Sequence, residues 1–402
     1  MPWLEWVSLF VRWFHVIAGV AWIGASFYFI WLDNSLRSPP QWKKDKGIKG
    51  DLWAVHGGGF YEVAKYSYGP EEMPSTLHWF KWEAYSTWLS GMALLIIVYY
   101  YGASSYLIDP SVMVLSPFEA ITYGLLYLFG GMAIYELACR SKLGKSPKIF
   151  AVFLSCLIVF ACWLATYLFS GRGAYIHVGA LIGTIMVGNV FLNIMPAQRK
   201  MVDAVTKKLP IDPAWGTGAK LRSVHNNYFT LPLLFIMISN HYPMTYQHEL
   251  NWLVLVAIIA LSSGIRHYFN LKHNDVHKPS ILVFGFIGMA LLALWVSWPQ
   301  ATSPDDKGLV SEEVFTAPLT DTQVRVSKII ETHCVSCHAQ HPQDAIFTVA
   351  PLGLKLDSWQ QIQANAPKIY NRTVVTKDMP LMNKTNMTDE ERKALADWYS
   401  NL

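Results

Sequence analysis

Charged side chains are scarce in this sequence. Only 15% of its 402 residues are Asp, Glu, Lys or Arg, whereas 52% are apolar. Eight apolar stretches of membrane-spanning length lie between Ser8 and Trp298, and residues 299–402 contain no such stretch. This composition excludes a fully water-soluble chain. It predicts an all-α fold, a polytopic eight-helix transmembrane bundle followed by a small polar tail.

Cysteine is rare as well, with five residues in the chain. Cys139, Cys156 and Cys162 fall within apolar stretches, where we expect small buried side chains. Cys334 and Cys337 form one pair, and no second cysteine pair follows, which argues against a four-ligand zinc site. His338 directly follows the pair, which argues against a simple redox dithiol. The glycine triplet at 57–59 lacks the Gly-Lys-Ser/Thr of a phosphate-binding loop, so that function is excluded too.

The cysteine pair belongs to the stretch Cys334-Val335-Ser336-Cys337-His338. With this spacing two sulfurs can bond the vinyl groups of a heme while the next imidazole binds the iron. We therefore predict covalently attached heme c with His338 as one axial ligand. Met379 is the predicted second ligand, and Met382 and Met387 are the alternatives.

The flanking segments predict a small class I cytochrome c domain over 323–402. A helix over 324–332 leads to the heme site, and Thr388 with the acids that follow it predicts a capped helix over 389–399. Pro351-Leu352-Gly353 resembles the segment whose proline carbonyl orients the heme histidine in small class I cytochromes c. Residues 300–322 are then a linker, and residues 1–299 form the transmembrane domain.

The basic residues predict the orientation in the membrane. Loops on one face of the bundle carry eighteen Lys and Arg residues, and the turns on the other face carry Arg172 alone. By the positive-inside pattern, the side of Arg172 lies outside, together with both termini. Heme c is attached on that same side, so we expect a multi-pass protein of the bacterial inner (plasma) membrane with a periplasmic cytochrome c domain. The predicted spans are 8–32, 78–101, 117–139, 149–169, 172–195, 223–242, 249–270 and 279–298.

Two histidines fall in the outer third of the predicted bundle. His15 and His177 could together hold a heme b, with Arg12 and Arg172 receiving its propionates. The alternative is a buried histidine whose hydrogen bonds are satisfied by protein. An intramembrane carrier would help an electron to cross a hydrocarbon layer of about 30 Å.

A second set of histidines lies at the inner helix ends. His78, His225 and His267 are accompanied there by Lys81, Arg222 and Arg266, which predicts either a second heme or an anion-binding substrate pocket, with ordinary interfacial histidines as the alternative. We expect the remaining histidines to be exposed: His56, His241, His248, His273, His277, His333 and His341. The long inner loop over 33–77, with its three glycines, is either a substrate-facing lid or a structural cap.

Three parts of the chain resemble one known family. They are the helix from Trp13 to Gly24 with His15, the His56-Gly57-Gly58-Gly59-Phe60-Tyr61 loop, and the tail with Cys334 to His338 and Asp378-Met379-Pro380. Together they resemble the bacterial membrane-bound urate oxidase (urate hydroxylase) family, an eight-helix domain fused to a cytochrome c. The opening helix is also similar to that of small membrane hemoproteins in which the corresponding histidine binds heme b.

The resemblance implies a reaction and partners. Urate would be oxidised to 5-hydroxyisourate, and electrons would pass through heme to a downstream cytochrome c or terminal oxidase without hydrogen peroxide. A planar anion needs cations and aromatic faces, so Arg266 is the predicted anchor, and Glu62, Glu83 or His78 the predicted base. The alternative is a membrane cytochrome that relays electrons from quinol or a partner dehydrogenase. We expect a lipid bilayer as surroundings and no nucleic-acid partner.

Overall fold

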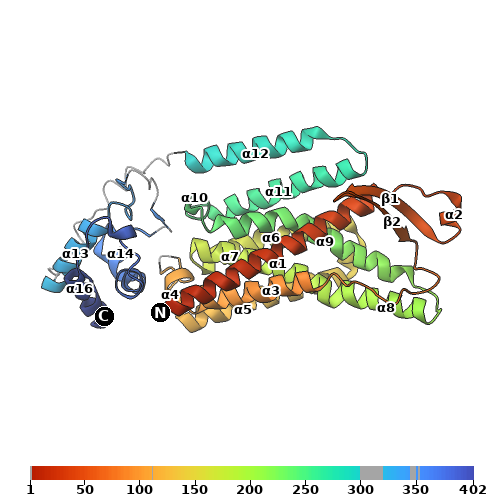
Figure 1. The fold of residues 1–402 in the computed structure, drawn as a ribbon. Helices are drawn as coiled ribbons and strands as arrows, with labels where there is room; N and C mark the ends of the chain where they lie inside the picture. Colours follow the sequence, from red (N-terminus) through yellow and green to blue (C-terminus); the bar gives the residue numbers. More distant parts are fainter. Residues whose placement is uncertain (1, 111, 299–319, 345–349, 352–353) are drawn as a thin grey trace.

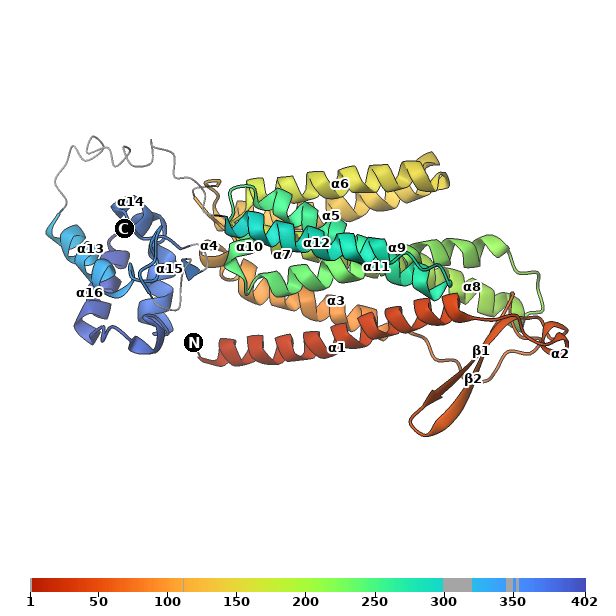
Figure 2. The same ribbon diagram turned by 90° about the horizontal axis from the view of Figure 1, so that it is seen from above.

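The structure is a computed structural model that describes residues 2–110, 112–298, 320–344, 350–351 and 354–402. Long helices run side by side in a bundle, the polar tail lies at one end of it, and a small β-hairpin lies at the opposite end (Figure 1). The two termini lie at the same end (Figures 1 and 2). The predicted linker over 300–322 lies outside the described residues, apart from 320–322.

Helices occupy all eight predicted spans. Six of them are long and apolar enough to cross a membrane, within the part of the chain that the structure describes. The other two predicted positions, α3 with η1 and α9, are also helical but more polar, so the count of eight stays a prediction. The bundle consists of α1 (Pro2–Ser35), α3 (Trp82–Leu94) continued by the π-helical turn η1 (Leu95–Tyr100), α5 (Pro117–Arg140), α6 (Pro147–Leu168), α7 (Gly171–Gly188) continued by the π-helical turn η3 (Asn189–Ile194) and α8 (Met195–Thr206), α9 (Pro213–Ser239), α11 (Asn251–His273) and α12 (Pro279–Ser297). Short helices connect them: α2 (Gln41–Lys44), α4 (Ala103–Tyr106), η2 (Lys142–Lys145) and α10 (Pro243–Tyr246).

The helix starts follow from local sequence. Pro117 occupies the first turn of α5, where its missing N–H costs nothing. Ser116 accepts from the Glu119 amide while the Glu119 carboxylate accepts from the Ser116 amide, which is a complete capping box. Glu119 therefore caps the N-terminus of this apolar helix.

The core centres on α7. In the most apolar stretch of that helix 61% of residues are buried, against 11% in α1 and 6% in α12. Large side chains such as Tyr135, Phe169 and Tyr175 fill the space around it. The exposed apolar faces of α1 and α12 have the character expected of surfaces that meet lipid.

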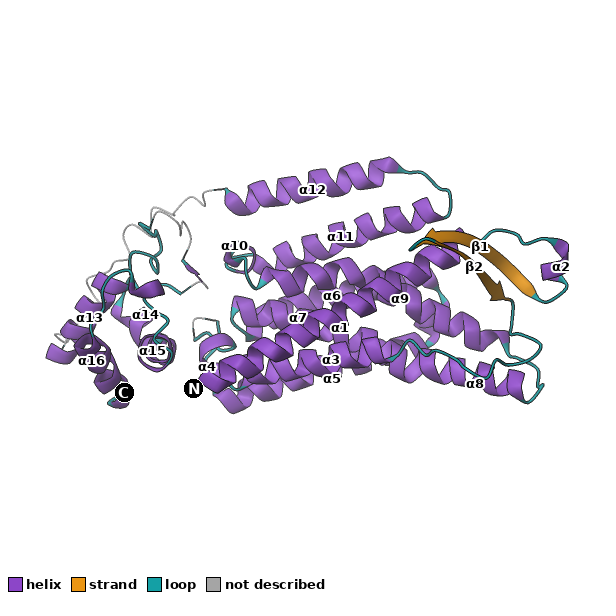
Figure 3. Ribbon diagram, viewed as in Figure 1, coloured by secondary structure: helices purple, strands orange, loops and turns teal. Residues whose placement is uncertain are grey.

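The all-α prediction is wrong for residues 48–66. There β1 (Ile48–His56) and β2 (Gly59–Tyr66) pair as an antiparallel hairpin, the strand pair drawn orange in Figure 3. Gly57 and Gly58 have φ angles of +58° and +81°, as a two-residue turn of this kind requires. The glycine triplet thus makes a hairpin turn. Figure 2 shows the hairpin extending away from the side of α1.

The tail folds around its own small core. It consists of α13 (Asp321–His333), α14 (Trp359–Ala364), α15 (Ala366–Tyr370), η6 (Asn371–Val375), η7 (Leu381–Asn383) and α16 (Asp389–Ser400). Ile330, Leu395 and Trp398 are among its buried residues. The predicted helix before Cys334 and the capped closing helix are both confirmed, with Thr388 and Glu391 forming the capping box.

Candidate functional site

The cysteine pair sits directly after α13. The amides of Cys337 and His338 donate to the carbonyl of Cys334, which keeps the three side chains on one compact turn. Burial of the Cys334 thiol raises its pKa to about 12, so the sulfur is a neutral, apolar group within the tail core.

His338 is oriented by a backbone carbonyl. Its Nδ1 lies 3.1 Å from the carbonyl oxygen of Leu354, and since a carbonyl only accepts, Nδ1 carries the proton and Nε2 is left with its lone pair. Burial, followed by the nearby charge of Arg372, lowers the pKa of His338 and keeps the ring neutral. The predicted role of the Pro351 carbonyl is therefore wrong: Leu354 fills it. Leu352 and Gly353 lie outside the described residues.

The structure also separates the methionines. Met387 is 3% exposed and packs in the tail core. Met379 is half-buried, and its carbonyl accepts from Nη1 of Arg392 at 2.9 Å. The side chain of Met382 is outside the described part. Two thiols, a neutral imidazole with a bare Nε2 and a half-buried thioether fit a covalent heme.

His15 has the hydrogen bond expected of an imidazole ligand. Its Nδ1 lies 3.0 Å from the Thr87 carbonyl oxygen and 3.0 Å from the Ser90 hydroxyl, so Nδ1 is the donor and Nε2 is unprotonated. A Cβ on Gly91 would come within 3.0 Å of the ring, so this glycine permits the close packing of α1 against α3. With Nδ1 hydrogen-bonded and Nε2 unprotonated, the His15 imidazole fits the role of a heme ligand.

His177 lies in different surroundings. It is fully buried, its Nδ1 donates to the Gly173 carbonyl at 2.8 Å, and its Nε2 lies 3.4 Å from the hydroxyl of Tyr100. Phe169 stacks on the ring, and a Cβ on Gly124 would come within 2.8 Å of Nε2. The described contacts do not bring His177 and His15 together. These neighbours favour a buried histidine satisfied by protein, so the predicted pairing receives no support.

The inner histidines do not form one cluster within the described residues. Nε2 of His78 lies 3.9 Å from the Glu83 carboxylate, and His78 is mostly exposed. His267 is exposed and its Nδ1 lies 2.6 Å from the hydroxyl of Tyr228. His225 contacts Tyr135 instead. Glu62, on β2, forms an ion pair with Lys43.

A buried polar network occupies the region around His225. Arg222 donates to the Asn189 amide oxygen at 3.1 Å and pairs with Glu136 at 2.9 Å. Asn189 in turn donates to the Tyr135 hydroxyl at 3.0 Å, and this hydroxyl lies 2.7 Å from Nδ1 of His225. His225 is thus held within the polar network. The sequence analysis did not identify Glu136 and Asn189 as the partners of Arg222.

Arg266 is an inner cation that remains available to a ligand. Arg266 is 5% exposed, its Nε donates to Asn227 at 2.6 Å, and its Nη2 has no hydrogen-bond partner among the residues the structure describes. Its guanidinium stands 4.1 Å from the centre of the Phe27 ring. It borders a cavity of about 450 Å³, a size within the usual range of small-molecule sites. The lining residues are Phe27, Tyr28, Trp31, Leu231, Arg266, Phe269 and His273.

His273 was expected to be solvent-exposed, and the structure corrects this. It lines the same cavity as Arg266, and its Nδ1 is buried and has no partner in the described part of the chain. The spacing of 266 and 273 on α11, two helical turns, could have indicated a shared face. His333 differs from expectation too: it is buried between Thr385 and Glu391. The predicted bases Glu62, Glu83 and His78 are not among the residues that line the cavity.

Apolar helices in a bundle with a polar helical tail define a multi-pass membrane protein. Within that class, residues 2–297 match the family described as urate oxidase N-terminal, and the chain belongs to this family. Membership indicates an oxidoreductase concerned with urate oxidation. No curated protein and no solved structure matches the chain.

Proposed function

We propose that the chain oxidises urate to 5-hydroxyisourate in the membrane and delivers the electrons to its own tail. The reaction adds one water to urate and releases two protons and two electrons. The observation that carries the proposal is the buried Arg266 with an unpartnered Nη2 in an aromatic cavity, in a chain of this family.

The cavity suits a planar purine anion. Arg266 would hold the anionic edge, since a guanidinium forms charge-assisted hydrogen bonds with such oxygens. Phe27 and Trp31 supply flat apolar faces. Asn227 fixes the guanidinium through Nε, so that Nη2 is left for the ligand.

A base must remove protons as electrons leave the purine. His273 is better placed than the bases predicted from sequence, because it lines the cavity with an unpartnered ring nitrogen. Glu62 is already held in an ion pair with Lys43. Exclusion of water by Leu231 and Phe269 would strengthen each polar contact in the cavity.

The electron acceptors would be held by residues already described. Cys334, Cys337, His338 and Met379 would hold heme c, and His15 would hold a heme b within the bundle. When bound, these groups supply one-electron redox chemistry, and a downstream cytochrome c or terminal oxidase completes the transfer without hydrogen peroxide. Both termini and the tail would then be periplasmic.

The test is anaerobic addition of urate to the purified full-length holoprotein. We expect the heme c absorbance to change to that of the reduced form, without quinol or a partner protein. Absence of reduction by urate, together with reduction by a quinol, would instead support the alternative of a membrane cytochrome without substrate chemistry of its own.

A further inference from the structure

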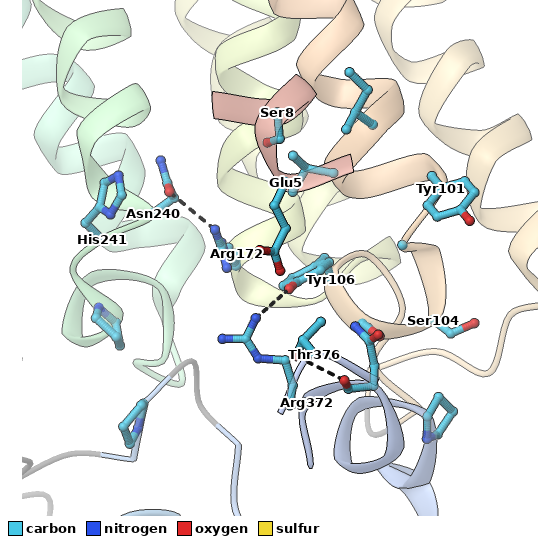
Figure 4. A pocket seen from close by; sticks show the side chains of 18 of the residues that line it. Glu5, Ser8, Tyr101, Ser104, Tyr106, Arg172, Asn240, His241, Arg372 and Thr376 are labelled. Atoms are coloured by element: carbon cyan, nitrogen blue, oxygen red, sulfur yellow. Dashed lines mark hydrogen bonds between the residues drawn. The ribbon is translucent and has the colours of Figure 1, made fainter. Parts of the chain in front are cut away.

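A second, larger cavity lies where the bundle meets the tail. Its volume is about 1470 Å³, and α1, η1, α4, α7, α12 and the tail helices α15, η6 and α16 all contribute to its lining. Figure 4 shows Arg172 and Arg372 on either side of Tyr106, one from the bundle and one from the tail. No part of the proposed urate chemistry uses this cavity.

The cavity carries excess positive charge. Three guanidinium groups line it, those of Arg12, Arg172 and Arg372, against the single carboxylate of Glu5 among the lining residues. Arg372 also pairs with Asp378 at 2.7 Å. Nε of Arg172 is buried and has no hydrogen-bond partner among the described residues, and Nη2 of the same side chain makes a long contact of 3.5 Å to Asn240. A donor is therefore left for a ligand.

Arg172 and Arg372 both contact the side chain of Tyr106. Nη1 of Arg372 lies 3.4 Å from the Tyr106 hydroxyl, and the Arg172 guanidinium stands 5.3 Å from the centre of the same ring. Both cations contact the same side chain, and an oxyanion between them would offset the repulsion of their like charges. The tail meets the bundle here, so such an anion would also stabilise their contact.

Part of the remaining lining is apolar and lies on helices that face outward. Leu4 and Leu9 come from α1 and Val296 from α12, the two helices with the fewest buried residues in their apolar stretches. Tyr101, which is 75% exposed, and Tyr106 also belong to the cavity wall, and tyrosines gather at the level of lipid headgroups. The cavity therefore offers cations to a headgroup and apolar surface to acyl chains.

We propose that this cavity binds the phosphate headgroup of an anionic phospholipid, with its acyl chains along α1 and α12. The phosphate lies between Arg172 and Arg372, so the lipid joins the tail to the bundle. This site is independent of the proposed urate cavity, which lies at the other end of α1.

The test uses the full-length holoprotein in nanodiscs of phosphatidylcholine alone and in nanodiscs that also contain phosphatidylglycerol. Native mass spectrometry after extraction measures retained lipid, and hydrogen exchange over 370–376 measures how firmly the tail is held. We expect phosphatidylglycerol to be retained and to slow exchange. Arg172→Gln and Arg372→Gln should each weaken its binding about tenfold, since each removes a charge-assisted hydrogen bond.

Two variants serve as controls. Arg172→Lys keeps the charge and should retain the preference for phosphatidylglycerol. Arg325→Gln removes a charge from an exposed site on α13, outside the cavity, and should change nothing. Equal binding of the two lipids, or binding unaffected by both glutamine variants at 172 and 372, would overturn the proposal. Full displacement of the lipid by inorganic phosphate at equal concentration would also overturn it, in favour of a free oxyanion.

Discussion

The substitution Arg266→Gln separates a ligand-binding role from a structural one. In the structure Nε of Arg266 donates a hydrogen bond to Asn227. Nη2 has no hydrogen-bond partner among the described residues and borders a cavity lined by aromatic rings. A charge-assisted hydrogen bond is worth ~1.5–3 kcal/mol. Since each ~1.4 kcal/mol is a factor of ten, we expect urate to bind about 10- to 150-fold more weakly to the variant.

Stability should change little. The variant loses the bond from the charged guanidinium to Asn227, worth ~1.5–3 kcal/mol, but it also removes a buried donor that lacks a partner among the described residues, a defect that costs ~1–3 kcal/mol. The free energy of unfolding should therefore stay close to its value in the unaltered protein. The matched comparison is Arg222→Gln, which strips a buried partner from Glu136 and should destabilise the bundle clearly.

The assay combines three measurements on each variant: equilibrium dialysis with labelled urate, thermal unfolding in detergent, and heme reduction by urate and by dithionite. Arg266→Gln should lose reduction by urate and keep reduction by dithionite. An unchanged urate affinity would refute the role of Arg266. A joint loss of stability and of both reductions would mean that the residue is structural.

Three further outcomes are expected. Met379→Ala should abolish the absorption band that arises from methionine sulfur bound to ferric heme. Met387→Ala should keep this band and lower the stability of the tail by ~2–5 kcal/mol, because Met387 is a core residue. Loss of the band in Met387→Ala alone would reverse the assignment. A Cys334→Ala/Cys337→Ala variant should still contain non-covalent heme by pyridine hemochrome analysis, and finding none would remove His15 as a ligand. The amide of Thr388, followed by His333, lowers the pKa of Glu391, so its contribution to tail stability is present above the ordinary glutamate pKa and is lost as the pH falls through the lowered value; Glu391→Gln should flatten acid unfolding of the tail followed by heme absorbance, and an unchanged acid transition would contradict this.

The tail was largely predictable because its signals are local. A capping residue and its acid lie three positions apart, as with Thr388 and Glu391, and the cysteine pair adjoins its histidine. The carbonyl that orients His338 was not predictable in the same way. It belongs to Leu354 rather than to Pro351, and only the path of the intervening chain decides between them.

The bundle helices were predictable from apolar stretches, but their polar contacts were not. Asn227 meets Arg266 across 39 residues of chain, and Arg222 meets Glu136 across a longer separation still. Such partners depend on which helices pack together, and that is decided by the whole core. The hairpin was missed for another reason: its alternation is short, and several of its large side chains, such as Phe60, face outward.

The π-helical turn η3 joins α7 to α8, so the number of residues in this continuous helix matters for its packing as much as their identity does. An ordinary α-helix rotates by about 100° at each residue, and a π-helical turn accommodates one additional residue without altering the direction of the chain. Deleting a single position between Asn189 and Ile194 would therefore let an ordinary α-helical turn replace η3, and the residues beyond it would keep their orientation. The same deletion within α7, which contains no additional residue, would rotate everything beyond it by about 100° and move Met195 away from its buried position.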